Sequence, residues 1–186
     1  EARVRNRHLD NPRLVSIIVP TYREAANLRP LVGRVVAAMQ SAGRACEMLI
    51  VDDDSRDGTD VAVQELAERH PVRLITRTGQ RDLSLAVVEG MRQARGQILL
   101  VMDADLSHPP EQIPRILEAL EQPPTDFVIG SRYVSGGQTQ EGWGVFRRLN
   151  SWVATALCRP LVGQVTDPMA GFFALRRDTF EQADPL

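Results

Sequence analysis

The 186-residue sequence lacks any run of 18 or more apolar residues, about the length that a membrane-spanning helix requires. It also lacks a signal-like apolar stretch near its start, so we expect this segment to be soluble by itself. Neither sign of charge is in excess, because 22 basic and 24 acidic residues give a net charge of -2. No overall electrostatic attraction therefore points to nucleic acid, and any basic site must be local.

Cysteine is scarce: only Cys46 and Cys158 occur, and they form neither a CxxC pair nor a Cys/His ligand pattern. This argues against a disulfide framework and a zinc site, and it makes a reducing compartment the default. The three histidines, His8, His70 and His108, are scattered, and we interpret them as surface or capping residues.

What the sequence does contain is 43% hydrophobic residues, enough for one domain with its own core. Short β-branched runs alternate with segments that carry apolar residues at helical spacing. The pattern predicts strands at 14–19, 48–51, 72–76, 98–102 and 127–130, and helices at 28–39, 61–69, 83–94 and 111–121. This alternation predicts an α/β fold in which helices flank a mostly parallel sheet.

The domain boundaries follow from composition. Residues 1–13 are polar and Arg-rich without a period, and we interpret them as an N-terminal arm. We assign residues 14–186 to one domain. Since the chain starts at Glu1 rather than Met and stops at Leu186 in what reads as the middle of a fold, we expect a fragment truncated at the C-terminus.

Three polar clusters mark the candidate site. They stand at 20–24 after the first predicted strand, at 52–55 after the second and at 103–105 after the fourth. Ligands of such sheets bind outside the carboxyl ends of the strands. We therefore expect the clusters to converge on one edge of the sheet.

The third cluster holds two carboxylates, Asp103 and Asp105, separated by the small residue Ala104. Alternate residues of an extended backbone point the same way, so both carboxylates would address one cation. The expected ion is Mg²⁺ or Mn²⁺, completed by diphosphate oxygens. The alternative is that Asp105 caps a following helix whose first turn holds Pro109 and Pro110.

The other two clusters suit a nucleoside. Three consecutive aspartates at 52–54 repel one another unless a cation offsets their charge or hydrogen-bond donors, such as a ribose or a base edge, bind them. The alternative is a solvated turn with a capping segment at 57–59. In the first cluster, Tyr22 and Glu24 suit stacking on a nucleobase and hydrogen bonding to it, and the alternative is a turn with a helix start.

Taken together in this order, the clusters resemble the family 2 glycosyltransferases, which have the GT-A (nucleotide-diphospho-sugar transferase) fold. Within that family they look like the dolichol-phosphate mannosyltransferase branch, over about residues 14–180. The resemblance is carried by VDDDSRDGT at 51–59, MDADLSHPPE at 102–111, GSRY at 130–133, Trp143 with Arg147 and Ser151, and DPMAGFF at 167–173.

The resemblance implies a metal-dependent, inverting transfer of mannose or glucose from GDP-mannose or UDP-glucose to a polyprenyl or dolichyl phosphate. It also implies three subsites, for the nucleoside, for the diphosphate with its metal and for the acceptor phosphate. The residues at the matching positions are Pro20, Tyr22, Glu24, Ile50 and Asp52 for the nucleoside, Asp103, Ala104 and Asp105 for the diphosphate and metal, and Arg132 and Arg147 for the acceptor.

Two positions depart from the family pattern. Ser107 stands where the family often has Gln, and a serine is a shorter and weaker third metal ligand. The sequence GQRDL at 79–83 replaces a glycine-rich loop, so Asp82 is expected to change the shape of the donor pocket.

The acceptor classes differ in their need for a base. A phosphate monoester has a second pKa of about 6, so it is largely dianionic at pH 7 and attacks without a general base. A rival enzyme with a hydroxyl acceptor would need a carboxylate base, for which Glu141 and Asp167 are the candidates. A non-catalytic nucleotide-sugar-binding module is a second rival. A dinucleotide-binding fold is disfavoured because no GxGxxG follows the first strand.

Residues 145–161 have apolar side chains at helical spacing with arginines alongside. This pattern is typical of an interfacial helix on a bilayer and equally of a helix packed on the sheet. With the family resemblance, it suggests a location on the cytoplasmic side of a membrane, peripheral or anchored by sequence not present here.

Overall fold

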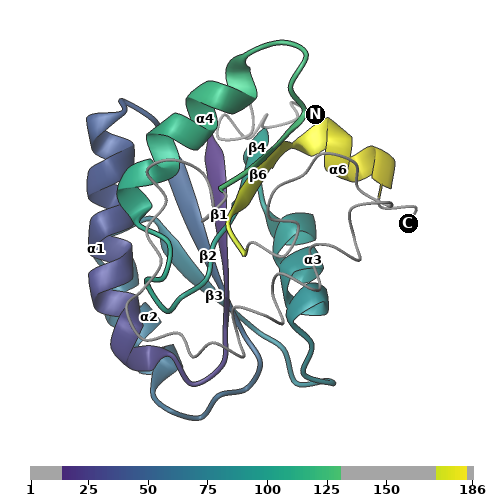
Figure 1. Ribbon diagram of the computed structural model, residues 1–186. Helices are drawn as coiled ribbons and strands as arrows, with labels where there is room; N and C mark the ends of the chain where they lie inside the picture. Colours follow the sequence, from purple (N-terminus) through teal and green to yellow (C-terminus); the bar gives the residue numbers. More distant parts are fainter. Residues whose placement is uncertain (1–13, 131–170, 184–186) are drawn as a thin grey trace, which may run out of the picture.

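Six strands form one sheet of order β3-β2-β1-β4-β6-β5 in the computed structural model, which describes residues 14–130 and 171–183 (Figure 1). The strands are β1 (Val15–Thr21), β2 (Cys46–Asp52), β3 (Val72–Thr76), β4 (Ile98–Val101), β5 (Phe127–Ile129) and β6 (Phe173–Arg176). The helices are α1 (Ala25–Ser41), α2 (Thr59–Ala67), α3 (Leu83–Gln93), the 3-10 helix η1 (Pro110–Gln112), α4 (Ile113–Glu121) and α6 (Arg177–Ala183). Every predicted strand and helix within these residues is confirmed, whereas the predicted arm at 1–13 lies outside them.

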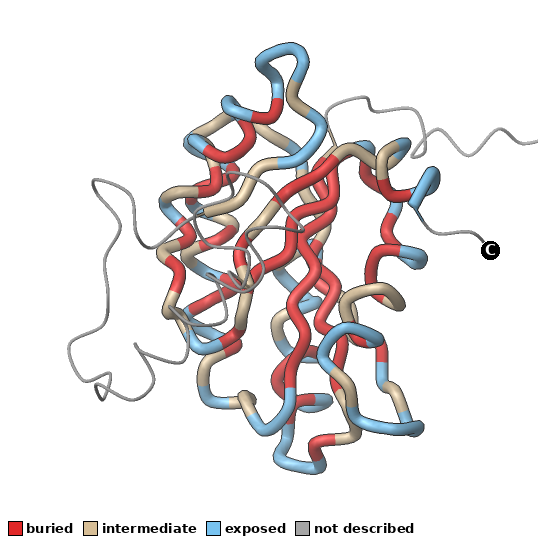
Figure 2. The backbone as a smooth tube through the Cα atoms, turned by 45° about the vertical axis from the view of Figure 1, so that its right-hand side comes forward, coloured by how far each residue is buried: buried red, intermediate tan, exposed pale blue. Residues whose placement is uncertain are grey.

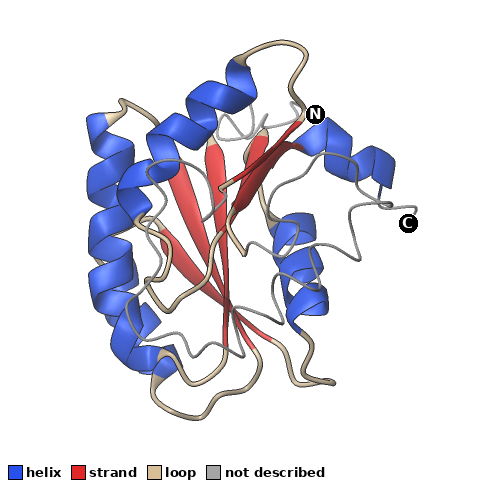
Figure 3. Cartoon of the chain, in the orientation of Figure 1, coloured by secondary structure: helices blue, strands red, loops and turns tan. Residues whose placement is uncertain are grey.

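Helices cover both faces of the sheet (Figure 3). One core cluster joins α1, α2 and α4 to the sheet, and a second joins α3 and α6 to the opposite face. The central strand β1 serves both, since Ile17 and Val19 belong to the first cluster and Ile18 to the second. All seven residues of β1 are buried, which Figure 2 shows as a continuous buried stretch through the middle of the domain.

Strand pairing confirms the mostly parallel sheet. Strand β1 pairs in parallel with β2 and with β4, and β2 pairs in parallel with β3. Strand β6 runs antiparallel to both β4 and β5. The sequence patterns did not predict β6, because its four residues, Phe-Ala-Leu-Arg, include no β-branched side chain.

Strand β1 extends beyond its predicted end. The sequence placed its stop at Pro20, but the strand continues through Pro20 to Thr21. The backbone of Ile18 is directed toward β4, since its carbonyl accepts the Met102 N–H. The backbone of Pro20, two residues later, is directed toward the same neighbour but lies beyond the end of β4. The N–H that proline lacks would therefore have no strand partner.

Two consecutive arginines at the junction of β6 and α6 tie the helix layers to the sheet. Arg176 donates from Nη2 to the Leu120 carbonyl in the last turn of α4, at 2.9 Å. Arg177 donates from Nη2 to the Ala94 carbonyl just after α3, and from Nε to the Gly96 carbonyl, both at 2.7 Å. Guanidinium groups therefore satisfy carbonyls at the carboxyl ends of helices from both layers.

Candidate functional site

The carboxyl ends of β1, β2 and β4 lie side by side, because these strands are adjacent and parallel. Thr21 at the end of β1 pairs with Asp52 at the end of β2, and Ile18 pairs with Val101 at the end of β4. The three polar clusters leave these strand ends. Their predicted convergence on one edge of the sheet is therefore confirmed.

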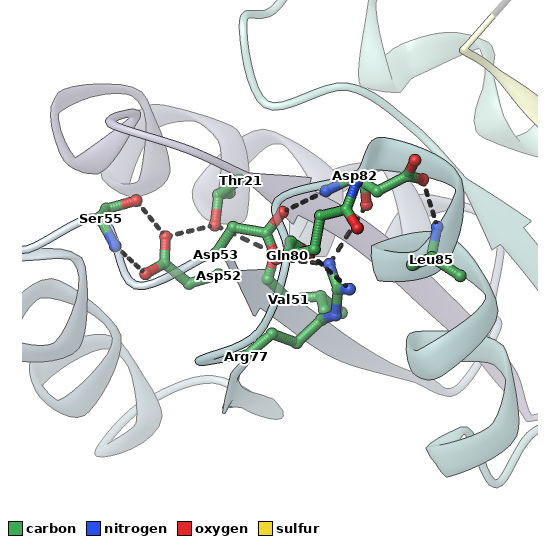
Figure 4. A network of polar contacts seen from close by, with 9 residues as sticks. All are labelled: Thr21, Val51, Asp52, Asp53, Ser55, Arg77, Gln80, Asp82 and Leu85. Atoms are coloured by element: carbon green, nitrogen blue, oxygen red, sulfur yellow. Dashed lines mark hydrogen bonds and ion pairs between the residues drawn. The ribbon is translucent and has the colours of Figure 1, made fainter.

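The Asp52 carboxylate organises the turn after β2 (Figure 4). It is buried, and it accepts hydrogen bonds from the Thr21 hydroxyl at 3.0 Å and from the Ser55 N–H at 2.8 Å. The Ser55 hydroxyl donates to the same carboxylate and accepts the Arg23 N–H. These bonds join the first and second clusters, so Asp52 fixes the shape of the turn from within.

Within the aspartate run, Arg56 pairs with Asp54. The charge of Asp53 is offset by Arg77, a residue that no sequence pattern singled out. Its guanidinium Nη1 lies 2.5 Å from Asp53 Oδ1, and it also donates to the carbonyls of Gln80 and Asp82 (Figure 4). The other carboxylate oxygen of Asp53 accepts the Asp82 N–H at 3.2 Å. The available signal was position: Arg77 directly follows β3, the neighbour of β2, where a cation was required.

Asp82 is the N-cap residue of helix α3, directly before its first residue. Its carboxylate accepts the Leu85 N–H at 2.9 Å and caps the helix, which is the usual role of aspartate at this position. The Arg77 contacts hold the preceding loop against the end of β2. The departure from a glycine-rich loop thus gives a segment fixed at both ends.

A pocket of about 340 Å³ opens between this loop and the end of β1. Its lining residues are Pro20, Thr21, Tyr22, Asp53, Arg81, Asp82, Leu83 and Ala86. The Arg81 guanidinium carbon lies 4.4 Å from the centre of the Tyr22 ring, a cation–π distance. The pocket thus offers an aromatic face, carboxylates and a cation at its wall.

The predicted nucleoside residues separate in the structure. Pro20 and Tyr22 line the pocket. Ile50 is wholly buried in the core cluster shared with α1, and Asp52 is buried under the turn that it organises. Glu24 precedes α1 and accepts a hydrogen bond from the Asn27 side chain. The structure therefore places two of the five predicted residues at the pocket wall.

The third cluster is a turn rather than a strand continuation. Strand β4 ends at Val101, Ala104 and Asp105 lie in a turn, and Leu106 has a left-handed φ of 61°. The extended-backbone argument for Asp103 and Asp105 was therefore wrong in its premise, because the buried Ala104 turns the chain. The helix-capping alternative was also wrong, because η1 has no side-chain cap, and Asp105 Oδ1 accepts the Ser107 N–H at 2.9 Å.

Both residues still offer carboxylate oxygens, the ligand type that Mg²⁺ and Mn²⁺ bind. The Asp103 side chain is 35% exposed, Asp105 is exposed, and the Ser107 N–H bonds to one oxygen of Asp105. No group of three or more His, Cys, Asp or Glu side chains able to hold a metal occurs at 14–130 or 171–183. A cation here would therefore need further ligands, as Mg²⁺ and Mn²⁺ sites that share substrate phosphates do.

The Asp57 carboxylate joins the first residues of two helices, α1 and α2, which begin beside this edge of the sheet. This carboxylate accepts the Ala25 N–H, the first of α1, and the Thr59 N–H, the first of α2, each at 3.1 Å. Partial burial opposes the charged form, but hydrogen bonds from the Thr59 hydroxyl and from these N–H groups outweigh it and lower the pKa of Asp57. The capping segment that belonged to the alternative interpretation is therefore present, and one carboxylate serves two helices, although the side chains of Asp52 and Asp53 are largely buried rather than solvated.

Several predicted residues lie outside the described part of the chain. These are Arg132 and Arg147 for the acceptor phosphate, Glu141 and Asp167 as rival bases, and the amphipathic segment 145–161. Over the residues that are described, no helix combines the length and apolar character needed to cross a bilayer.

Solved structures with this architecture define the class of protein. Mannosyl-3-phosphoglycerate synthase from Rubrobacter xylanophilus is similar with a TM-score of 0.68 and 23% identity, over 90% of this chain and 54% of that one. A mannosyltransferase from Pyrobaculum calidifontis, in complex with GDP-Man and Mn²⁺, is similar with a TM-score of 0.59 and 25% identity, over 93% of this chain and 47% of that one. These neighbours are GT-A glycosyltransferases, so the predicted GT-A fold is confirmed.

The sequence comparisons then give the family. The model of glycosyl transferase family 2 matches residues 16–183, and the chain belongs to this family. Dolichol-phosphate mannosyltransferases from Pyrococcus furiosus and Mycosarcoma maydis are 45% and 47% identical to it, over 90% and 91% of this chain. These matches cover 47% and 58% of the relatives, so the chain spans about half of their length. The resemblance seen in the sequence is confirmed.

Proposed function

We propose that the chain is the donor-binding catalytic unit of an enzyme that transfers mannose from GDP-mannose to a polyprenyl phosphate at a membrane surface. One observation carries the proposal: the pocket beside Tyr22 opens at the same edge of the GT-A sheet as the turn that holds Asp103 and Asp105. Relatives named as dolichol-phosphate and undecaprenyl-phosphate mannosyltransferases, at 40–47% identity, support the sugar and the acceptor class.

Each part of the site has a separate task in this proposal. The Tyr22 ring, with Arg81 beside it, stacks on the base, and Asp53 offers a fixed acceptor whose position Arg77 holds. Asp103 and Asp105 hold a divalent cation, Mg²⁺ or Mn²⁺, with Ser107 as a weaker third ligand. When bound, that cation neutralises charge that develops on the leaving diphosphate.

The acceptor needs positioning more than activation. A phosphate monoester is mainly dianionic at pH 7, so it attacks the anomeric carbon without a general base and the configuration inverts. Arg132 and Arg147 bind this dianion through paired, charge-assisted hydrogen bonds. A hydroxyl acceptor would instead depend on a base such as Glu141 or Asp167.

Transfer to two acceptors tests the proposal. The protein is given GDP-mannose with Mn²⁺ and either a short-chain polyprenyl phosphate or the matching neutral polyprenol. We expect mannosyl transfer to the phosphate alone, and loss of it with EDTA. UDP-glucose in place of GDP-mannose tests the donor, and transfer to the neutral alcohol would favour the hydroxyl-acceptor enzyme. Donor binding without any transfer would favour a non-catalytic module.

A further inference from the structure

The Asp103 carboxylate lies against a glycine from a distant part of the sequence. A Cβ built on Gly171, which stands just before β6, would lie 2.3 Å from Oδ2 and 2.6 Å from Oδ1 of Asp103. Such distances are too short for any real Cβ. The φ of Gly171 is not in the left-handed region, so glycine is required here by space and not by backbone conformation.

The segment that presents Gly171 is firmly held. The next residue, Phe172, is 2% exposed, and its carbonyl accepts the Gly130 N–H at 2.8 Å. Its ring packs so closely on Gly130 that a Cβ there would lie 2.5 Å from Cδ1 of Phe172. Strand β6, which follows, pairs with β4, the strand that leads to Asp103 (Figure 1). The segment against which the Asp103 carboxylate lies is thus anchored to the sheet.

His108 completes the surroundings of this carboxylate. It is 3% exposed, and its ring centre lies 5.2 Å from that of Phe172 at a tilt of 37°. From there its Nε2 lies 3.8 Å from Asp103 Oδ2. Asp105, by contrast, is exposed and its Oδ1 accepts a hydrogen bond from the adjacent turn. The two carboxylates therefore differ in how firmly they are placed.

We propose that Gly171, Phe172 and His108, which we call the Asp103 brace, are positioning residues that set the Asp103 carboxylate for a divalent cation. The inference rests on the proposed function, because it assigns the brace to the cation that Asp103 and Asp105 hold there. Partners behind a metal ligand fix its orientation, and their loss typically weakens metal binding about 10–100-fold. The brace makes the segment that leads into β6 a part of the metal site, although this segment supplies no metal ligand.

Substitution of Gly171 is the direct test. Gly171→Ala places a methyl group where the carboxylate lies, and we expect the Kd for Mn²⁺, measured by electron paramagnetic resonance with and without GDP, to rise about tenfold. Gly33→Ala is the matched control, because a Cβ at this helical position meets nothing within 4 Å. It should leave the Kd unchanged.

A thermal-unfolding cycle without metal tests the contact itself. Gly171→Ala should lower Tm in the wild-type background but not beside Asp103→Ala, where the clashing atoms are absent. His108→Phe keeps a ring on Phe172 but removes Nε2, so it should weaken Mn²⁺ binding severalfold, with circular dichroism checking that the variant folds. This variant also decides the matter if Gly171→Ala fails to fold.

The outcomes separate the brace from the proposed function. If Gly171→Ala binds Mn²⁺ as tightly as the wild type, the brace is overturned and the proposed function stands. If Gly171→Ala fails to fold, equally tight binding by His108→Phe has the same meaning. A wild type that binds no Mn²⁺, even with GDP, would overturn both the metal dependence and the brace. Equal Tm loss from Gly171→Ala in both backgrounds would show that it does not act through Asp103.

Discussion

The guanidinium of Arg77 and the carboxylate of Asp53 form an ion pair between the ends of two adjacent parallel strands, with 2.5 Å from Nη1 to Oδ1. The side chains are only 14% and 9% exposed, so water screens the pair little. Arg77 also donates to the loop carbonyls of Gln80 and Asp82. One side chain thus joins the aspartate turn to the loop that forms a wall of the pocket.

Loss of Arg77 should therefore destabilise the domain. We expect Arg77→Ala to lower the free energy of unfolding by about 3 kcal/mol, because it leaves the Asp53 charge buried without its partner. Urea denaturation measures this change. The double variant Arg77→Met with Asp53→Asn should lose less, since it removes the unpaired charge as well. Equal losses in the two variants would contradict a role for the charge pair.

Asp105→Asn should abolish transfer and leave the fold intact. Asparagine keeps the Oδ1 that accepts the Ser107 N–H, so the turn survives while the charge that attracts a cation is lost. We expect turnover to fall by at least about 100-fold, with unchanged circular dichroism and Tm. Turnover near the wild-type rate with metal dependence retained would exclude Asp105 as a metal ligand.

Substitution of Arg132 tests whether this residue binds the acceptor or the donor. If it grips the acceptor phosphate, Arg132→Ala should raise the activation free energy of transfer by about 2–3 kcal/mol and leave the affinity for GDP-mannose nearly unchanged. Arg132→Lys should recover only part of this loss, because lysine keeps the charge without the planar fork. Parallel losses in donor binding and transfer would place Arg132 on the donor diphosphate instead.

The Asp57 carboxylate gives the stability of the domain a dependence on pH. Its pKa is lowered in the folded state, so its contribution is complete above the unfolded pKa of about 3.9 and is lost as pH falls through the folded value. We expect Asp57→Ala to cost about 1 kcal/mol at pH 7, the usual value of a helix cap. Urea titrations should show this difference shrinking below about pH 4. A difference that is constant down to pH 2 would assign the effect to packing.

Cys46 should resist alkylation in the native state. Burial, and secondly the neighbouring charge of Glu47, raise the pKa of its thiol to about 11. Against an ordinary thiol pKa of 9.0, the thiolate fraction at pH 7.5 is roughly 100-fold lower. In a Cys158→Ser background, iodoacetamide should modify the unfolded chain readily and the native one slowly, as mass spectrometry would record. Equally fast labelling of both states would mean that the thiol is accessible.

The layered fold was predictable because each buried strand and each helix long enough to show a period left its own pattern. The convergence of the clusters followed from the parallel order of the strands alone. Strand β6 was missed because its four residues include no β-branched side chain and its place in the sheet is set by contacts with strands distant in the sequence.

The site was predictable in residue type but not in geometry. An acidic pair after β4 suggested a cation, yet the turn at Ala104 depends on tertiary packing that no spacing rule contains. Arg77 was missed because its partner, Asp53, follows a different strand, and only the sheet order brings the two residues together. Gly171 was noted as part of a motif, but its closeness to Asp103 is a matter of space between distant segments.

The place of β6 in the sheet bears on how the chain is made. A ribosome releases β1 to β5 first, yet β5 pairs with β6 alone among the described strands, and β4 keeps an open edge until β6 emerges. An unpaired edge of apolar residues invites pairing with other chains. A nascent chain from which β6 has not yet emerged therefore lacks the strand that pairs with this edge of β4, whose four residues are all apolar. Codon choice in the stretch before β6, and chaperones that bind during its synthesis, should govern how much soluble protein a cell obtains.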